Sequence, residues 1–421
     1  MAQKGDFAVA WSFAIASIAS GELNMLESLN LKILLILTIG LSFAALLGYL
    51  SHKIKLSPIF GYLLAGYLIG PYSPGFVADL DTAEQLSEIG IVLMLFGAGM
   101  HFKWQDLIRV RRIAVPGAII QVLVATVFIT MIFHKMGWAK ESGIIIGLSI
   151  GVASTMVLIR VLHDNHALRT AEGHIAVGWL IVEDIITIFM LLLIPVLAAS
   201  LVGEQISYKE LTFSILGALF KFLLMAVLLL TLGFRLVTFI LKKIKVIKYP
   251  ELFTLTTLAI MFAISIGSAS LFGTSIALGA FIAGMVIAQT KDRHLVSAQI
   301  APLKDAFVVV FFLSVGMLFN PLGLSVDISI TLLILATILI IKPITAFLLC
   351  LILKHPIKTA LTVAVGLAQI GEFSFILAKE AISYRLLPDE IYSMIVACAL
   401  ISISINPIFF KLTRQYRPRK H

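Results

Sequence analysis

Charged side chains are scarce in this chain of 421 residues: only 13% are Asp, Glu, Lys or Arg, whereas a soluble globular protein carries about 25%. Cysteine is nearly absent, because only Cys350 and Cys398 occur and both lie in apolar stretches. This pattern gives no indication of a disulfide framework or a metal site. The sequence also lacks a Walker loop, a G-x-G-x-x-G motif and a zinc-type spacing of Cys and His. With 60% hydrophobic residues, the composition indicates a membrane protein.

Apolar runs recur along the whole sequence, and most are long enough for a helix that crosses a hydrocarbon core of about 30 Å. They predict an all-α polytopic membrane protein with about thirteen spans. The predicted spans cover residues 31–50, 57–71, 85–102, 113–133, 141–162, 173–199, 212–240, 250–270, 272–289, 303–319, 328–352, 357–382 and 391–412. A shorter apolar stretch from Phe7 to Ala19 is interpreted as an interfacial segment, with a signal-like region as the alternative.

The net charge of +9 is distributed as expected for a membrane topology and not for a nucleic-acid-binding surface. If the first span runs from outside to inside, the loops on the cytoplasmic side hold most of the 32 Lys and Arg residues. We therefore expect the N-terminus outside and the C-terminus in the cytoplasm. The basic tail is expected to lie near anionic membrane lipid, and no nucleic-acid partner is expected.

Three pairs of similar segments occur in the same order in the two halves of the chain. They are GYLLAGYLIG (61–70) with GAFIAGMVIA (279–288), LFGAGMHF (95–102) with LSVGMLF (313–319), and GLSIGVAST (147–155) with GLAQIGEFS (366–374). Because the charge pattern gives equivalent spans opposite directions, we predict two six-helix inverted-topology repeats, an architecture typical of transporters. The alternative is that apolar, glycine-rich helices resemble one another by composition alone.

We accordingly expect one transmembrane domain over residues 1–421. Its expected parts are an extracytoplasmic or interfacial segment (1–30), a first inverted repeat (31–200), a linker helix (212–240), a second inverted repeat (250–412) and a basic cytoplasmic tail (413–421).

The third pair of segments marks two spans that we expect to be broken. Glycine and small hydroxyl residues weaken the helix in both, and such unwound backbone is tolerated at membrane depth only where protein or water satisfies it. The residues concerned are Gly147, Gly151, Ser154 and Thr155 in the fifth span, and Gly366, Gln369, Gly371 and Glu372 in the twelfth. Broken helices at equivalent positions of inverted halves indicate an ion site near the membrane midplane. Ordinary packing of small residues is the alternative.

Two adjacent carboxylates, Glu183 and Asp184, interrupt an apolar stretch that runs from Ile175 to Ala199. A carboxylate at that depth costs several kcal/mol if it faces lipid, so it is expected to face protein or water. The usual reason for such a group is that a proton or a cation must visit it, which makes the chain a candidate transporter.

Several of these motifs together resemble the Kef-type branch of the monovalent cation:proton antiporters. The matching segments are GYLLAGYLIGP (61–71), GWLIVEDI (178–185), ALGAFIAGM (277–285), FFLSVGM (311–317) and AQIGEFSFIL (368–377). The resemblance implies a sodium/proton antiporter-like fold with about thirteen helices, a core domain with two crossed broken helices, and a dimerisation domain against which the core moves like an elevator. It also implies a homodimer in a bacterial inner membrane. Many Kef-type proteins carry a cytosolic nucleotide-binding regulatory domain, which we expect to be absent here; a separate regulatory subunit is a possible partner.

The resemblance also assigns roles to individual residues. Asp184 falls on the ion-binding aspartate, where the monovalent cation and the proton compete. Thr155 and Ser154 fall on the first crossover region, and their oxygens are expected to complete the cation shell. Supporting charge is expected from Lys342, on the helix before the second broken one, and polar groups from Gln369 and Glu372 in the second crossover region.

Alternatives remain for the other charged residues near the site. Glu183 either hydrogen-bonds within the core or serves as a second proton carrier. Lys342 either neutralises the empty carboxylate of Asp184 or pairs with Glu183 or Glu372. Glu372 either acts at the site or neutralises a helix N-terminus. Lys379 is expected to snorkel toward the external surface.

The predicted function is the exchange of K⁺ or Na⁺ for protons by alternating access. No enzyme activity and no cofactor beyond the transported ions is expected. Three alternatives on the same fold are a cation channel, an ion sensor that does not transport, and a sodium-coupled carrier of an organic anion. The choice between K⁺ and Na⁺ or Li⁺ and the proton stoichiometry stay open at this level.

Overall fold

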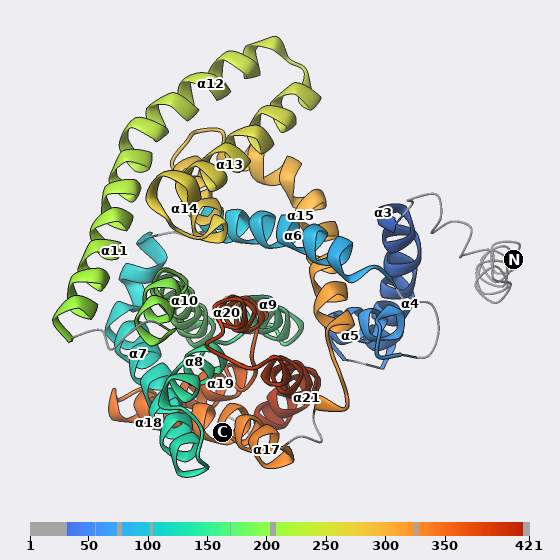
Figure 1. Ribbon diagram of the computed structural model, residues 1–421, viewed down its shortest axis with the longest axis vertical. Helices are drawn as coiled ribbons and strands as arrows, with labels where there is room; N and C mark the ends of the chain where they lie inside the picture. Colours follow the sequence, from blue (N-terminus) through green and yellow to red (C-terminus); the bar gives the residue numbers. More distant parts are fainter. Residues whose placement is uncertain are drawn as a thin grey trace, which may run out of the picture.

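The computed structural model describes residues 32–54, 56–73, 78–101, 104–168, 170–202, 208–323 and 327–415. This part of the chain is almost entirely helical (Figure 1). In it, ten helical segments are long and apolar enough to cross a membrane, and three shorter apolar helices accompany them. The all-α polytopic fold is therefore confirmed, whereas the number of thirteen spans stays a prediction. The predicted N-terminal segment and the end of the basic tail lie outside the described residues.

One bundle combines the first helices of each half of the chain, and we call it the scaffold. It consists of α3 (Lys32–Leu35), η1 (Ile36–Gly40), α4 (Leu41–Lys53), α5 (Pro58–Ile69), α6 (Leu80–His101), α13 (Pro250–Phe272), α14 (Ile276–Ala288) and α15 (Arg293–Met317). α6 packs closely against both α14 and α15, and α5 packs against α4 and α15. The π-helical turn η1 joins α3 and α4 into one continuous span.

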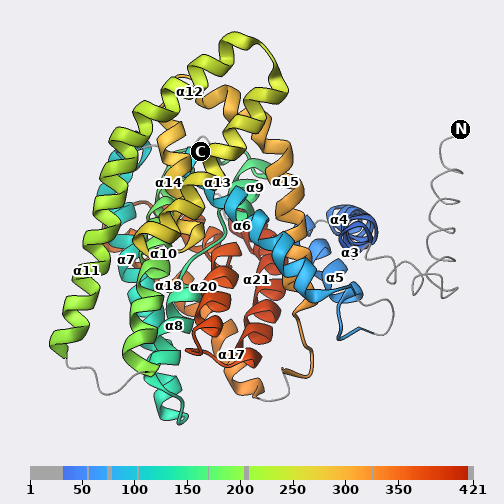
Figure 2. The same cartoon turned by 45° about the horizontal axis from the view of Figure 1, so that its top comes forward.

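The second bundle, the core, combines the later helices of each half. It consists of α7 (Trp104–Lys135), α8 (Lys140–Gly151), α9 (Thr155–Asp164), α10 (Ala171–Val202), α17 (Ile328–Ala336), η3 (Thr337–Ile341), α18 (Lys342–Ile352), α19 (Ile357–Gly366), α20 (Glu372–Ser383) and α21 (Asp389–Gln415). A long helix made of α11 (Tyr208–Leu228), η2 (Leu229–Gly233) and α12 (Phe234–Ile247) runs along one side of the molecule and connects the core to the scaffold (Figures 1 and 2).

The close helix contacts of the scaffold repeat between the two halves. A Cβ atom on Gly66 would lie 2.1 Å from the carbonyl oxygen of Leu313 and 3.0 Å from the Cα of Gly316. A Cβ atom on Gly99 would lie 3.1 Å from the Cα of Gly284. The sequence pairs align Gly66 with Gly284 and Gly99 with Gly316, so one contact is the counterpart of the other. This correspondence supports the inverted repeat, because similar composition alone would not place aligned glycines in equivalent helix contacts.

The two predicted helix breaks are confirmed. The fifth span is divided into α8 and α9 by Val152–Ser154, and the twelfth is divided into α19 and α20 by residues 367–371. The hydroxyl of Ser154 accepts a hydrogen bond from the amide of Val157 at 3.2 Å and so caps the start of α9. The other predicted spans agree with the observed helices within a few residues at most ends; the largest differences are at α15, which begins ten residues earlier than predicted, and α7, which begins nine residues earlier.

One ion pair fixes the start of α6 outside the predicted membrane interior. Asp79 accepts hydrogen bonds from Lys32 at 2.7 Å and from the amide of Thr82 at 2.9 Å. These donors lower the pKa of Asp79 to about 2. Because the folded-state pKa is depressed, the stabilising contribution is present above the ordinary carboxyl pKa and is lost only as the pH falls toward 2. The contact therefore persists throughout the physiological pH range.

The glycine contacts yield a stability prediction. Gly284→Ala should destabilise the scaffold by about 1–3 kcal/mol or more, because the added Cβ would lie 2.1 Å from the carbonyl oxygen of Phe96 and backbone cannot move aside cheaply. Gly267→Ala on α13 is the matched control. A Cβ there meets nothing within 4 Å, so the gain in helix propensity should leave stability equal or higher. The measurement is the thermal unfolding midpoint of the purified protein, and equal midpoints for the two variants would contradict the expectation.

Candidate ion site at the crossing of two broken helices

The two helix breaks meet inside the core and are held together by one amide side chain. The Oε1 atom of Gln369 accepts a hydrogen bond from the amide of Ser154 at 3.0 Å, and its Nε2 donates to the carbonyl of Ser154 at 3.1 Å. A Cβ on Gly371 would lie 2.5 Å from the Cα of Ser154, so only glycine allows this approach. Gln369 thus satisfies an unwound segment that the membrane interior would otherwise leave without partners.

Hydroxyl groups link the two broken helices further. Ser154 donates to the Oε2 atom of Glu372 at 2.9 Å, and Ser374 donates to the carbonyl of Ser149 at 2.6 Å. Glu372 is the first residue of α20 and is only 3% exposed. Its carboxylate therefore lies at a helix N-terminus, where negative charge is favourable. This position agrees with the alternative in which Glu372 neutralises a helix N-terminus. The hydroxyl of Ser154 was expected to coordinate the cation, but it bonds instead to Glu372 and to the amide of Val157.

Lys342 contacts the C-terminal end of α8 and the break that follows α19. Its Nζ donates to the carbonyl of Ile150 at 3.0 Å and to that of Gln369 at 3.1 Å. The side chain is fully buried. An ammonium group at the C-terminal end of α8 complements the partial negative charge there, and it also satisfies a carbonyl of the second break. Among the carboxylates, Glu183 is the one that interacts electrostatically with Lys342, which favours the interpretation of Lys342 as the partner of Glu183.

Glu183 is also fully buried and has defined partners. It accepts a hydrogen bond from Nε2 of Gln121 on α7 at 2.6 Å and another from the backbone amide of Ala153 at 2.8 Å. Ala153 lies in the first helix break. The carboxylate therefore satisfies an amide of the break while the ammonium of Lys342 satisfies carbonyls. This geometry favours a role for Glu183 in holding the core together.

Asp184 differs from its neighbour. Its Oδ2 accepts a hydrogen bond from Thr155 at 3.3 Å, whereas its buried Oδ1 has no hydrogen-bond partner among the described residues. The carboxylates of Glu372 and Glu183 interact with it electrostatically. A buried polar atom without a partner is costly, and this one belongs to a carboxylate that interacts with two further carboxylates. Such an oxygen suits a proton or a cation that binds and leaves.

Two cavities are lined by residues of α10 on either side of Asp184, and Asp184 itself lines neither of them. One, of about 510 Å³, lies between core and scaffold and is lined by Leu191, Glu88 and Lys379 among others. Another, of about 520 Å³, is lined by residues on the first turns of α10 up to Ile181. Ile181 and Leu191 flank Asp184 on one face of the helix, three residues before it and seven after. Asp184 thus lies between the two cavities along α10.

The structure brings together all seven side chains predicted from the sequence: Asp184, Glu183, Thr155, Ser154, Lys342, Glu372 and Gln369. Sequence reasoning missed Gln121, the partner of Glu183. A buried amide inside the apolar span 113–133 was the available signal. Among the described residues, no cluster of three His, Cys, Asp or Glu side chains suits a tightly held metal ion. The donor set of carboxylate and hydroxyl oxygens is suited to a hard cation.

An all-helical membrane fold in which two broken helices cross is typical of secondary transporters of the antiporter class. The transmembrane sodium/hydrogen exchanger family model matches residues 40–413, and the chain belongs to this family. The prediction of an antiporter of this kind is thereby confirmed at the level of the family.

Individual relatives agree with this assignment. The chain is 42% identical over 377 residues to the putative cation/proton antiporter YbaL of Escherichia coli strain K12, covering 90% of this chain and 68% of that protein. It is 30% identical over 361 residues to K(+) efflux antiporter 4 of Arabidopsis thaliana, covering 84% of this chain and 59% of that protein. The solved structure of the sodium proton antiporter MjNhaP1 from Methanocaldococcus jannaschii at pH 8 shares the fold, with a TM-score of 0.66 at 16% identity, over 90% of this chain and 97% of that one.

The contacts of Lys342 and Glu183 yield a prediction on stability. Lys342→Met should destabilise the protein by about 3–5 kcal/mol, because it leaves a buried carboxylate without its counter-charge and two carbonyls without a donor. In the double variant Lys342→Met/Glu183→Gln the buried charge is removed as well, so part of the loss should be recovered. The measurement is a double-variant cycle of thermal midpoints, and strictly additive effects would show that the two charges are not coupled.

Proposed function

We propose that the chain exchanges a monovalent cation, K⁺ or Na⁺, for protons, and that both ions compete for the carboxylate of Asp184. The observation that carries the proposal is the unpartnered Oδ1 atom of Asp184 at the crossing of the broken helices. The cavities on either side of it along α10 support access from both membrane faces. The relatives named as cation/proton and K⁺ efflux antiporters support the ion class.

The physical basis is competition for one buried group. A bare carboxylate in the membrane interior costs several kcal/mol, and Glu372 and Glu183 add negative charge around Asp184. Either a proton or a cation removes this cost. If the core moves between the two membrane faces only when Asp184 holds a proton or a cation, it must return with a proton after each movement with a cation. The result is exchange of the cation for the proton. Thr155, which donates to Asp184 at 3.3 Å, supplies a hydroxyl oxygen beside the carboxylate for the cation.

The assembly and the orientation belong to the same proposal. The core is proposed to move as a unit against the scaffold, and the scaffold to form the contact between two copies in a homodimer. The basic loops support an N-terminus outside and a C-terminus in the cytoplasm of a bacterial inner membrane. A separate regulatory subunit is a possible further partner.

The test is ion-driven proton movement in proteoliposomes. Luminal pH is followed while K⁺, Na⁺ or Li⁺ is added to wild type and to Asp184→Asn. We expect cation-driven proton movement in the wild type and its loss to the level of protein-free liposomes in the variant, because an amide carries no exchangeable charge. Comparing the three cations ranks them.

Asp305→Asn provides the matched control, since this carboxylate lies on α15 of the scaffold and is 66% exposed. It should keep the activity of the wild type. Cation flux without proton movement would identify a channel, and cation binding without flux would identify a sensor. Either result, or full activity of Asp184→Asn, would overturn the shared-site mechanism.

A further inference from the structure

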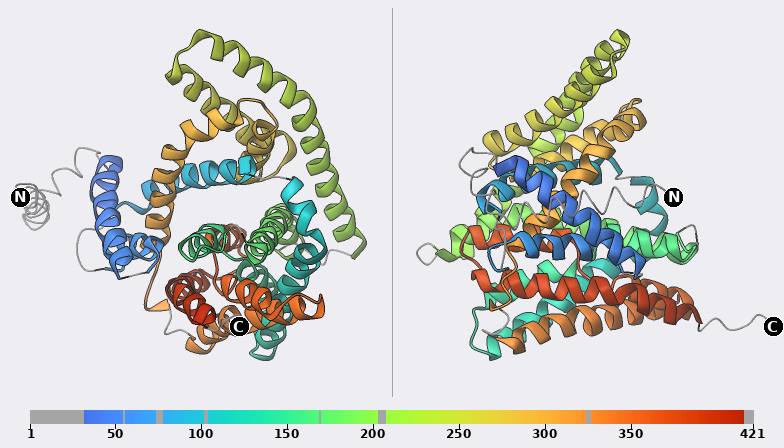
Figure 3. Two further views of the ribbon diagram at one scale, coloured as in Figure 1. Left: turned by 180° about the vertical axis from the view of Figure 1, so that it is seen from behind. Right: turned by 90° about the vertical axis from the view of Figure 1, so that its right-hand side faces the viewer.

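A single charged side chain interrupts the long apolar helix that connects the core to the scaffold. Lys221 lies in α11, and residues 212–234 hold no other Asp, Glu, Lys, Arg or His. The helix runs along the outside of the molecule (Figures 1 and 3), and the side chain of Lys221 is exposed. In a membrane, a side chain exposed on this helix faces lipid, so the ammonium group meets an apolar surrounding.

The other two lysines inside predicted spans have partners within the chain. Lys342 donates to two backbone carbonyls. Lys379 forms an ion pair with Glu84 of α6 at 3.7 Å, so it has a protein partner in addition to the expected reach toward the surface. Lys221 has no hydrogen bond or ion pair with any of the residues that the structure describes. It is therefore the exception among these lysines, and the proposed ion site does not use it.

The position of Lys221 along the helix makes a lipid-facing ammonium costly. The apolar segment begins at Thr212, nine residues earlier, and the next charged residue is Arg235, fourteen residues later. At 1.5 Å per residue these separations are about 14 Å and about 21 Å along the helix axis. Lysines near helix ends reach the membrane surface by snorkelling, whereas a lysine in mid-span normally pairs with another polar group. A partner of opposite charge is accordingly expected beside Lys221.

The surface around Lys221 has room for a second helix. Gly217 lies four residues before Lys221 and so on the same face of α11. A Cβ atom on Gly217 would meet nothing within 4 Å, which means that no described part of this chain fills the space above it. Phe213 and Phe220 are 73% and 66% exposed on the same helix. A glycine at such a position allows the backbone of another transmembrane helix to approach closely.

A second copy of this chain does not supply the missing charge from its described spans. The carboxylates within those spans are Glu88, Glu141, Glu183, Asp184, Glu251, Asp305, Glu372 and Glu380. The three in mid-span belong to the helix crossing, and Glu88 and Glu380 line the cavity between core and scaffold. The remaining three lie within three residues of a span end. The headgroup of a phospholipid carries a negative charge, but it lies at the membrane surface and not at mid-span.

We propose that α11 is a docking site for a transmembrane helix of a different protein, which pairs an Asp or Glu of its own mid-span with Lys221. Gly217 gives that helix the space to approach. The proposal makes the further subunit of the proposed function specific, and it rests on that function for the membrane setting and not for the ion chemistry of Asp184. Because α11 and α12 join the core to the scaffold, the bound helix contacts the element that connects the two bundles.

The test measures association with a synthetic probe helix in vesicles of phosphatidylcholine, which carry no net charge. The probe is a single-span peptide of leucine and alanine with one Glu, prepared in three forms that place the Glu at three depths around mid-span. The protein carries a donor dye at its C-terminus and the peptide carries an acceptor dye. Energy transfer as a function of the ratio of peptide to lipid gives an apparent dissociation constant.

We expect at least one of the three peptides to bind the wild type. Lys221→Met should raise its apparent dissociation constant about five- to thirtyfold, the range of polar contacts between model transmembrane helices. Replacing the Glu of the peptide by Gln should have the same effect. Lys221→Glu should bind a peptide that carries Lys at the same depth, because the exchange of charges restores the pair.

Matched variants separate the docking surface from other effects. Gly217→Leu keeps the charge and should still weaken binding, because it fills the space that the second helix needs. Gly267→Leu on α13 is its control, since a Cβ there also meets nothing within 4 Å, and it should leave binding unchanged. Asp184→Asn should bind as the wild type does, so failure of the antiport mechanism and failure of the docking site are distinguishable.

The stability of the protein without peptide provides a second measurement. Lys221→Met should keep or raise the thermal unfolding midpoint, because it removes an unpaired charge from lipid. A lower midpoint would show that Lys221 has a partner inside the chain and would overturn the proposal. So would equal binding of the Glu and Gln peptides, or failure of all three Glu peptides to bind. Self-association of the protein that depends on Lys221, or a rise in midpoint with phosphatidylglycerol that Lys221→Met abolishes, would assign the lysine to a second copy or to lipid instead.

Discussion

The structure depends on one constraint: backbone that leaves the helical conformation inside a membrane must find its hydrogen-bond partners within the protein. At the crossing of the broken helices these partners carry full charges. Lys342 donates to a carbonyl at the end of α8 and to a carbonyl of the second break, and Glu183 accepts from an amide in the first break. The amide side chain of Gln369 joins the two breaks directly. Positive charge on carbonyl ends and negative charge on amide ends stabilise a conformation that lipid alone would not permit.

The hydrogen bonds at the crossing give the adjacent carboxylates Glu183 and Asp184 different roles. One residue of helix rotation, about 100°, directs Glu183 toward Gln121 and the break, and leaves Asp184 with one oxygen unpartnered. A group that is fully bonded holds structure, whereas a group with a free acceptor can exchange ligands. The chemistry proposed for the site therefore follows from the difference between neighbouring positions of one helix, and no resident metal cluster is needed to explain it.

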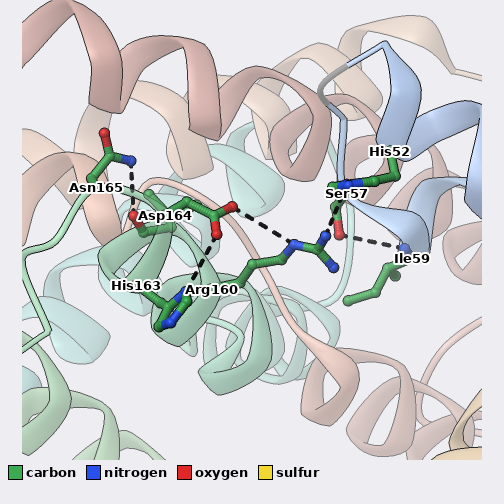
Figure 4. Close-up of polar contacts among 8 residues, drawn as sticks. His52, Ser57, Ile59, Arg160, His163, Asp164 and Asn165 are labelled. Carbon is green, nitrogen blue, oxygen red and sulfur yellow. Dashed lines mark hydrogen bonds and ion pairs between the residues drawn. The ribbon is translucent and has the colours of Figure 1, made fainter.

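The scaffold meets a different requirement, because it must provide a rigid surface for the core. Glycine at the crossing points lets helix backbones approach within contact distance, and equivalent glycines do so in both halves. The inverted repeat also distributes the contacts between scaffold and core, since Arg160 on α9 contacts His52 (Figure 4) and Lys379 on α20 forms an ion pair with Glu84. Figure 3 shows the two bundles and the long connecting helix from behind and from the side.

The sequence by itself determined the spans, the two breaks and the candidate carboxylates. Each follows from local physics: apolar length sets a span, glycine and small polar residues weaken a helix, and a carboxylate at membrane depth is costly wherever it lies. It also indicated that Lys342 belongs to the site, through resemblance to a family. Only the tertiary structure decided which polar groups meet. The contacts of Glu183 with Gln121, of Lys342 with Ile150 and of Arg160 with His52 join residues 62, 192 and 108 positions apart. The packing of helices that are distant in the sequence determines these partners. The local pattern of apolar and polar residues does not show which of them will meet.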